Sequence, residues 1–107
     1  MSLEIGKKAE ERVTHYLQAQ GYTIIDRNFH SRFGEIDIIA QKNSVLDFIE
    51  VKYSKAYDPL YRITPKKMAK IIKTIHYFFM LHPQDKDYQI SAALVNDEEI
   101  EFLENIS

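Results

Sequence analysis

The sequence contains no cysteine among its 107 residues, and it has no long apolar run. Without cysteine, the chain cannot form disulfides, thiolate zinc sites or a cysteine nucleophile, and a reducing compartment is expected. No stretch approaches the roughly 20 apolar residues of a membrane-spanning helix. The first eight residues lack the apolar core of a signal peptide. We therefore expect a cytoplasmic protein with no membrane segment.

The composition is that of an ordinary globular protein. Hydrophobic residues make up 45% of the chain and charged residues 28%, which excludes a disordered or fibrous protein. The length suits one core and leaves no room for two. We therefore predict a single domain over residues 1–107.

Charge is distributed unevenly although the net charge is only −2. Residues 52–77 carry seven basic side chains and one acidic one, whereas residues 78–107 carry one basic and seven acidic side chains. Such a basic segment between acidic ones is typical of a local surface for a polyanion. The alternative is a solvated helix face without a partner.

The hydrophobic pattern predicts an α/β domain. A helical period over residues 3–20 ends at Gly21, and Thr64-Pro65 is a typical cap and first turn for a second helix. Alternating or apolar runs predict strands elsewhere, and Asn43-Ser44 suits a tight hairpin turn. The predicted strands are 22–26, 35–41, 45–52, 88–95 and a short terminal 100–103, with a polar connection at 28–34 and a loop at 53–63. The order is α-β-β-β-α-β with a terminal strand.

The strand at 45–52 breaks its own pattern. One face begins with Leu46 and Phe48 and then becomes Glu50 and Lys52. An unpaired buried charge is costly, so this end of the strand should be open to water or should hold a compensating ion.

A two-residue turn at Asn43-Ser44 would place Asp37 opposite Glu50 and Glu35 opposite Lys52. Opposed carboxylates repel at the short cross-strand distance, and a divalent cation between them would turn the repulsion into binding. Oxygen ligands without His or Cys favour Mg²⁺ or Mn²⁺. The alternative is a surface salt bridge between Glu35 and Lys52, with Asp37 capping the loop.

The first helix adds one more acidic side chain. Glu10 lies at the border of the apolar stripe, one turn after Gly6, where it could reach the edge of the sheet. The alternative is that Glu10 bends toward water.

Three segments together resemble a known signature. They are Gly6-Lys-Lys-Ala-Glu10, Phe33-Gly-Glu-Ile-Asp-Ile-Ile-Ala40 and Phe48-Ile-Glu-Val-Lys52. They resemble the PD-(D/E)xK nuclease motif and most closely the YraN-like family of small bacterial proteins. The proline of the motif is absent, since Ile36 precedes Asp37, and Ser54 stands where many relatives have a basic residue.

The resemblance implies a restriction-endonuclease-like fold, with a mixed central sheet flanked by helices and similar to archaeal Holliday junction resolvases. It implies Asp37, Glu50 and the Val51 carbonyl as ligands of Mg²⁺ or Mn²⁺. Lys52 would position or activate the attacking water, and Glu10 would support the metal site.

The basic segment supplies candidate phosphate contacts, namely Lys55, Arg62, Lys66, Lys67, Lys70 and Lys73. Tyr57, Tyr61 and Tyr77 lie among them and could pack against sugars or unpaired bases. No base-reading element is evident, so the expected partner is DNA recognised by its structure, either branched or single-stranded. An exposed strand at 100–103 would allow pairing with a second copy in a homodimer.

Three hypotheses follow for the function. The first is a metal-dependent DNA endonuclease or resolvase-like enzyme. The second is a catalytically weak nucleic-acid-binding module that kept the nuclease fold and works in DNA repair or recombination. The third is an interaction protein in which the charged residues only form salt bridges.

Overall fold

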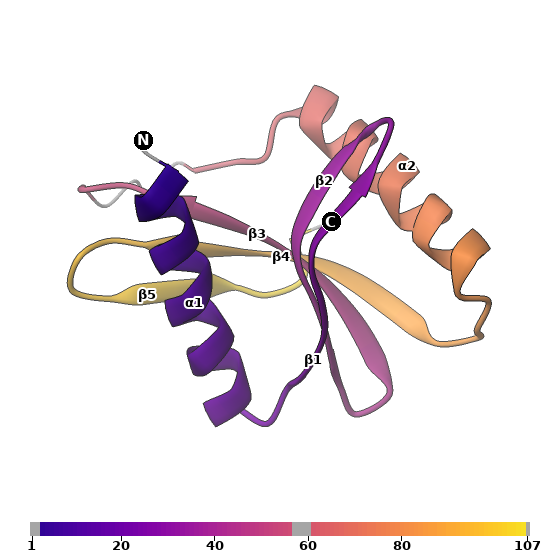
Figure 1. Ribbon diagram of the computed structural model, residues 1–107, viewed down its shortest axis with the longest axis horizontal. Helices are drawn as coiled ribbons and strands as arrows, with labels where there is room; N and C mark the ends of the chain where they lie inside the picture. Colours follow the sequence, from indigo (N-terminus) through magenta and orange to yellow (C-terminus); the bar gives the residue numbers. More distant parts are fainter. Residues whose placement is uncertain (1–2, 57–60, 107) are drawn as a thin grey trace.

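The computed structural model describes residues 3–56 and 61–106. Two helices and five strands follow one another in the predicted order, and Figure 1 shows the β1–β2 hairpin between the two helices. The elements are α1 (Leu3–Ala19), β1 (Thr23–Ser31), β2 (Gly34–Lys42), β3 (Val45–Tyr53), α2 (Pro65–Leu81), β4 (Asp87–Val95) and β5 (Ile100–Leu103). The predicted α/β class is confirmed.

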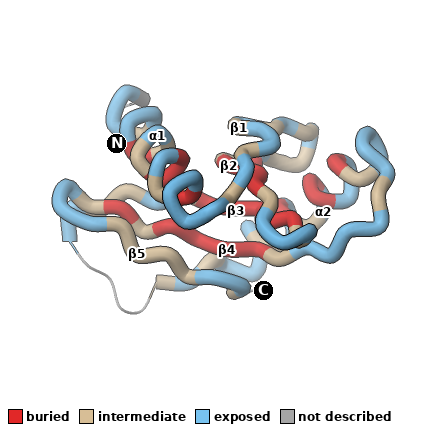
Figure 2. The backbone as a smooth tube through the Cα atoms, turned by 90° about the horizontal axis from the view of Figure 1, so that it is seen from below, coloured by how far each residue is buried: buried red, intermediate tan, exposed pale blue. Residues whose placement is uncertain are grey.

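The five strands form one mixed sheet in the order β1-β2-β3-β4-β5. Strands β3 and β4 run parallel and are joined through α2, whereas the other neighbours are antiparallel. The central strands β3 and β4 are buried along most of their length, while the helices expose their outer faces (Figure 2). Strands that are apolar on both faces are typical of such a helix-covered sheet.

Two apolar clusters cover the two faces of the sheet. Val13 and Leu17 of α1 pack against the side that carries Ile49. Ile75 of α2 packs against the side that carries Phe48. Since Phe48 and Ile49 are neighbours in a strand, their side chains point to opposite faces, and each helix therefore covers one face.

The first strand is longer than the sequence predicted. The polar connection expected at 28–34 is wrong, because β1 extends to Ser31 and pairs with β2 up to the Ser31–Gly34 pair. The connection is reduced to a two-residue turn at Arg32-Phe33. The polar side chains are tolerated because β1 lies at the edge of the sheet, where alternate residues face water.

The turn at Asn43-Ser44 fixes the register of the next hairpin. Both residues have positive φ, 52° and 66°, as a two-residue turn between twisted strands requires. The predicted pairing is confirmed from Lys42–Val45 through Ile38–Ile49.

The second helix starts as predicted. The Thr64 side chain accepts a hydrogen bond from the backbone N–H of Lys67, and Pro65 occupies the first turn. Of the loop expected at 53–63, residues 57–60, which include Tyr57, lie outside the described residues. In the described part of the chain, neither helix is long and apolar enough to cross a membrane.

Candidate active site

A fork between β2 and β3 creates the site. The backbone pairs end at Ile38–Ile49, and beyond them the Oδ2 of Asp37 accepts a hydrogen bond of 2.8 Å from the backbone N–H of Val51. The carboxylate of Asp37 thus takes the place of the backbone carbonyl that β2 would offer to Val51 if the two strands stayed paired. Figure 1 shows the β1–β2 hairpin diverging from β3 toward α2.

The side-chain alternation of β2 also breaks at Asp37. Strict alternation along a strand would place Ile36, Ile38 and Ala40 on one face, but Ile36 departs from it. Ile36 packs in the α2-side cluster, whereas Ile38 and Ala40 pack in the α1-side cluster. The twist that carries the hairpin toward α2 turns Ile36 to the other side, so that Asp37 lies at the change of face.

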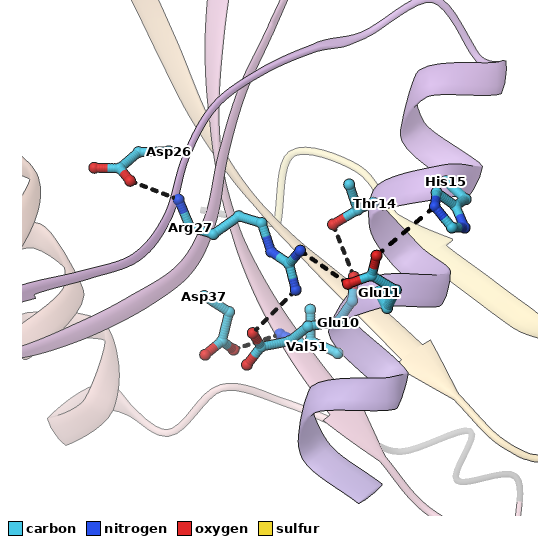
Figure 3. Close-up of polar contacts among 8 residues, drawn as sticks. All are labelled: Glu10, Glu11, Thr14, His15, Asp26, Arg27, Asp37 and Val51. Atoms are coloured by element: carbon cyan, nitrogen blue, oxygen red, sulfur yellow. Dashed lines mark hydrogen bonds and ion pairs between the residues drawn. The ribbon is translucent and has the colours of Figure 1, made fainter. Parts of the chain in front are cut away.

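Three carboxylates meet at this point. Glu10 from α1 and Glu35 and Asp37 from β2 each offer an oxygen, and these atoms lie within 4.8 Å of one another. Figure 3 shows the Glu10 and Asp37 side chains near each other, with Val51 beside them. Glu10 therefore reaches the sheet, as its position at the helix border indicated, and does not bend away into water.

Arg27 of β1 balances part of this negative charge. Its guanidinium lies 3.0 Å from Glu11 and 3.9 Å from Glu10, so it is placed between two residues of the same helix (Figure 3). The longer distance is beyond a hydrogen bond. Glu10 Oε1 is buried and has no hydrogen-bond partner among the described residues.

Glu50 reaches the same region from β3. Its side chain is only 7% exposed, and its Oε2 lies 2.9 Å from the Nζ of Lys67 in the first turn of α2. The other oxygen, Oε1, is buried without a hydrogen-bond partner among the described residues. The predicted pairing of Asp37 with Glu50 and of Glu35 with Lys52 does not continue the backbone ladder, because the strands have already separated.

Burial and neighbouring negative charge raise the pKa of two of these carboxyl groups, those of Asp37 and Glu50. Burial, followed by the charge of Glu50, raises the pKa of Asp37 from 3.8 to about 7, although the N–H of Val51 lowers it. Burial also raises the pKa of Glu50 despite the stabilising contact with Lys67. The hydrogen bond to Glu50 in turn raises the pKa of Lys67. Raised pKa values in a concave site are typical of functional groups.

An open cleft of about 640 Å³ contains these groups. Acidic residues of β2 and β3 line it together with basic residues from the start of α2. These lining residues are Glu35, Asp37, Glu50, Val51, Lys66, Lys67 and Lys70. The cleft therefore combines buried negative charge with positive charge near its mouth.

The structure does not bring every predicted site residue into the cleft. Lys52 is exposed and lines a separate pocket with Tyr61, Leu94 and Glu101. The expected alternative, a salt bridge from Glu35 to Lys52, is also wrong, because Glu35 pairs with His30 at 2.8 Å.

The remaining basic candidates lie in different places. Lys73 is exposed beside the cleft, with its Nζ 5.3 Å from the centre of the Phe33 ring. Lys55 is exposed near the end of β3. Arg62 donates to the backbone oxygen of Tyr61 and lines a third pocket. The basic residues that line the cleft are therefore the α2 residues Lys66, Lys67 and Lys70.

The donor set fits a hard divalent cation. Carboxylate oxygens of Glu10, Glu35 and Asp37 lie together, and Glu50 lines the same cleft as Glu35 and Asp37. Carboxylates are the ligands that Mg²⁺ and Mn²⁺ prefer, and one oxygen each of Glu10 and Glu50 is buried without a hydrogen bond among the described residues. A bound cation would compensate the desolvation that now raises the pKa of Asp37.

Sequence reasoning missed the roles of three residues, of which Lys67 was expected only as a phosphate contact. Glu35 joins the carboxylate group, and its place two residues before Asp37 in a strand could have indicated a shared face. Arg27 and Lys67 neutralise Glu10 and Glu50 through contacts between elements distant in sequence. No local signal reveals those two contacts.

The fold of the chain is restriction-endonuclease-like. It is similar to the solved structure of Hjc, a Holliday junction resolvase of Archaeoglobus fulgidus, with a TM-score of 0.63 and 22% sequence identity. The similarity covers 89% of this chain and 72% of the resolvase chain. At this identity the comparison establishes the fold.

The family follows from the sequence comparisons. Residues 9–97 match the model of "Uncharacterised protein family UPF0102". A UPF0102 protein of Wolinella succinogenes is 47% identical, and the match covers 100% of this chain and 99% of that protein. A UPF0102 protein of Campylobacter fetus is 46% identical, and the match covers 95% of this chain and 92% of that protein. A UPF0102 protein of Helicobacter pylori is 48% identical over 95% of this chain and 90% of its own. The chain belongs to the UPF0102 family, which confirms the YraN-like resemblance of its motifs.

Proposed function

We propose that this protein is a metal-dependent endonuclease that hydrolyses phosphodiester bonds in DNA. The observation that carries the proposal is the meeting of Glu10, Glu35 and Asp37 within 4.8 Å at the fork, beside the buried Glu50. Glu35 is exposed, whereas Glu10 and Asp37 are half-buried and Glu50 is buried. Negative charge gathered and partly desolvated in this way is unfavourable for folding alone, and it suits a site that binds a cation. The similarity of the fold to a Holliday junction resolvase supports a nucleic-acid substrate.

Each residue has a role that its position supports. Asp37 and Glu50, with the Val51 carbonyl, would hold Mg²⁺ or Mn²⁺, and Glu10 and Glu35 would orient water at the α1 side. The cation would supply a water of lowered pKa and neutralise charge on the phosphate. Lys66, Lys67 and Lys70 at the cleft would hold the phosphodiester backbone.

One observation favours a second candidate function. Lys52, the expected lysine of the nuclease motif, lines a different pocket from Asp37 and Glu50. A site without that cation would have weaker stabilisation of the phosphate, which fits a catalytically weak nucleic-acid-binding module. Lys67 offers a cation within the cleft and so keeps the enzymatic function in first place.

Cleavage assays separate the two candidates. The purified protein is incubated with labelled four-way junction, single-stranded and duplex DNA in Mg²⁺ or Mn²⁺. Endonuclease function predicts metal-dependent products that disappear in Asp37→Ala and persist in Asp26→Ala, an exposed residue of the edge strand. DNA binding without any cleavage in either metal would refute the enzyme and leave the binding module.

Two finer expectations belong to the same proposal. The preferred substrate is branched or single-stranded DNA, because the cleft is open and no base-reading element is evident in the sequence. A homodimer is expected for an enzyme that acts on both strands of a junction. The gel mobility of products and sedimentation of the protein test these two expectations.

A further inference from the structure

The turn between β1 and β2 is fixed against α2. The hydroxyl groups of Ser31 and the buried Thr74 lie 2.8 Å apart, and the backbone N–H of Phe33 donates to Ser31 Oγ at 3.0 Å. At Gly34 a Cβ atom would lie 3.7 Å from the Cβ of Lys70. These contacts hold the tip of the hairpin at a defined place beside the lysine-bearing face of α2.

This arrangement presents an aromatic ring at the cleft. Phe33 is half-buried and lines the same cleft as Asp37 and Glu50. The Cζ of Arg32 lies 4.9 Å and the Nζ of Lys73 5.3 Å from the centre of its ring. A cation at such a distance is attracted to the ring but is easily exchanged at an exposed position.

The cations around Phe33 differ from Lys67 in their partners. Among the described residues, the ion pairs include Lys67 with Glu50 but none made by the side chains of Arg32, Lys70 or Lys73. All three are exposed. Lys70 lines the cleft, and Arg32 and Lys73 lie over the ring of Phe33, which also lines it. Positive groups without carboxylate partners at such a place are complementary to a chain of phosphates.

We infer that Phe33 is a stacking platform for an unpaired base of the nucleic acid that enters the cleft, with Arg32 and Lys73 moving from the ring to the adjoining phosphates. The inference rests on the proposed function and specifies its substrate, since duplex bases are covered by their neighbours and only an unpaired base offers a face. Of the tyrosines considered from the sequence, Tyr77 packs against Phe29. Burial, followed by the charge of the nearby Glu50, raises the pKa of Tyr61.

Binding measured without cleavage tests the platform. Fluorescence anisotropy in EDTA compares a labelled single strand with its duplex for the wild type, Phe33→Leu and Phe33→Trp. Loss of one stacking contact should weaken single-strand binding by Phe33→Leu about 5- to 150-fold. Duplex affinity should change by less than about twofold, and Phe33→Trp should retain single-strand affinity. Unchanged single-strand binding by Phe33→Leu, or equal losses on both substrates, would overturn the inference.

An oligonucleotide series makes the test independent of mutant folding. One abasic position is moved along the single strand. The wild type should lose affinity at one position, and Phe33→Leu should be insensitive there. An equal response of both proteins at every position would also refute the platform. Lys73→Met, a matched control for charge, should lower the salt dependence of binding to both substrates by about one ion.

The two proposals can fail separately. Binding in EDTA needs no catalysis, so a selective loss in Phe33→Leu would stand even if no DNA is cleaved. Conversely, metal-dependent cleavage abolished by Asp37→Ala would stand if Phe33→Leu bound all DNA normally.

Discussion

Replacing Asp37 by asparagine should stabilise the protein at neutral pH when no divalent cation is bound. The substitution removes a buried charge that is close to Glu10, Glu35 and Glu50. It leaves an amide oxygen that can still accept the hydrogen bond from the N–H of Val51. The expected gain in folding stability therefore comes from removal of the charge, while the hydrogen bond to Val51 is kept.

The magnitude follows from the raised pKa of Asp37, which moves from 3.8 to about 7 on folding. The folded state binds this proton more tightly than the unfolded state, so the wild type loses stability as pH rises between about 4 and 7. Each tenfold change in proton affinity corresponds to about 1.4 kcal/mol, which gives a total of about 4 kcal/mol. Of this total loss in wild-type stability, about 3 kcal/mol occurs as the pH rises from 5 to 8.

Urea denaturation in EDTA at pH 5 and pH 8 measures the effect. The stability of Asp37→Asn minus that of the wild type should grow by about 3 kcal/mol between these two pH values. Asp26→Asn, an exposed carboxyl on the neighbouring strand, is the matched control and should show no comparable growth. A constant difference in stability between Asp37→Asn and the wild type across this range would show that Asp37 does not titrate with a raised pKa.

Other predictions concern the cation and its competitors. Lys67→Met should raise the affinity for Mn²⁺ about tenfold, as measured by calorimetry, because the Lys67 ammonium contacts a carboxylate oxygen of Glu50 that the cation would need. Lys66→Met is the control and should change the affinity less, and equal effects of the two substitutions would contradict competition between Lys67 and the cation. Mn²⁺ binding at pH 6 should release close to one proton from Asp37, and much less at pH 8, since the pKa of that carboxyl is about 7. Calorimetry in buffers of different ionisation enthalpy counts the protons, and a release that does not depend on pH would contradict the assignment. Excess Mn²⁺ should reverse the stability order of wild type and Asp37→Asn in urea, and a preserved order would exclude Asp37 as a ligand.

Local chemistry explains what could be predicted from the sequence. The left-handed φ values of Asn43 and Ser44 permit one hairpin register, so the pairing of Ile38 with Ile49 followed from the turn alone. The capped start of α2 at Thr64 is equally local. The conformation of such a hairpin turn or first helical turn is determined by residues that are adjacent in the sequence.

The fork at Asp37 could not be predicted, because its cause lies far away in the sequence. The β1–β2 hairpin leaves β3 to pack on α2, where Ser31 meets Thr74 and Gly34 approaches Lys70 closely. A simple hairpin model continues the ladder and pairs Asp37 with Glu50.

The same long-range packing decides which lysine enters the cleft. Lys67 reaches Glu50 from α2. Lys52, only two residues from Glu50, lines a separate pocket with Leu94 of β4 and Glu101 of β5. Sequence spacing alone favoured Lys52.

The cation site itself can be tested by calorimetric titration of Mn²⁺ into the wild type and into Glu50→Gln. A cation held at the fork should give a saturable heat for one site in the wild type. In Glu50→Gln that heat should be lost, or the affinity should fall at least about tenfold. Indistinguishable titrations of the two proteins, with both folded, would contradict a cation site at the fork between β2 and β3.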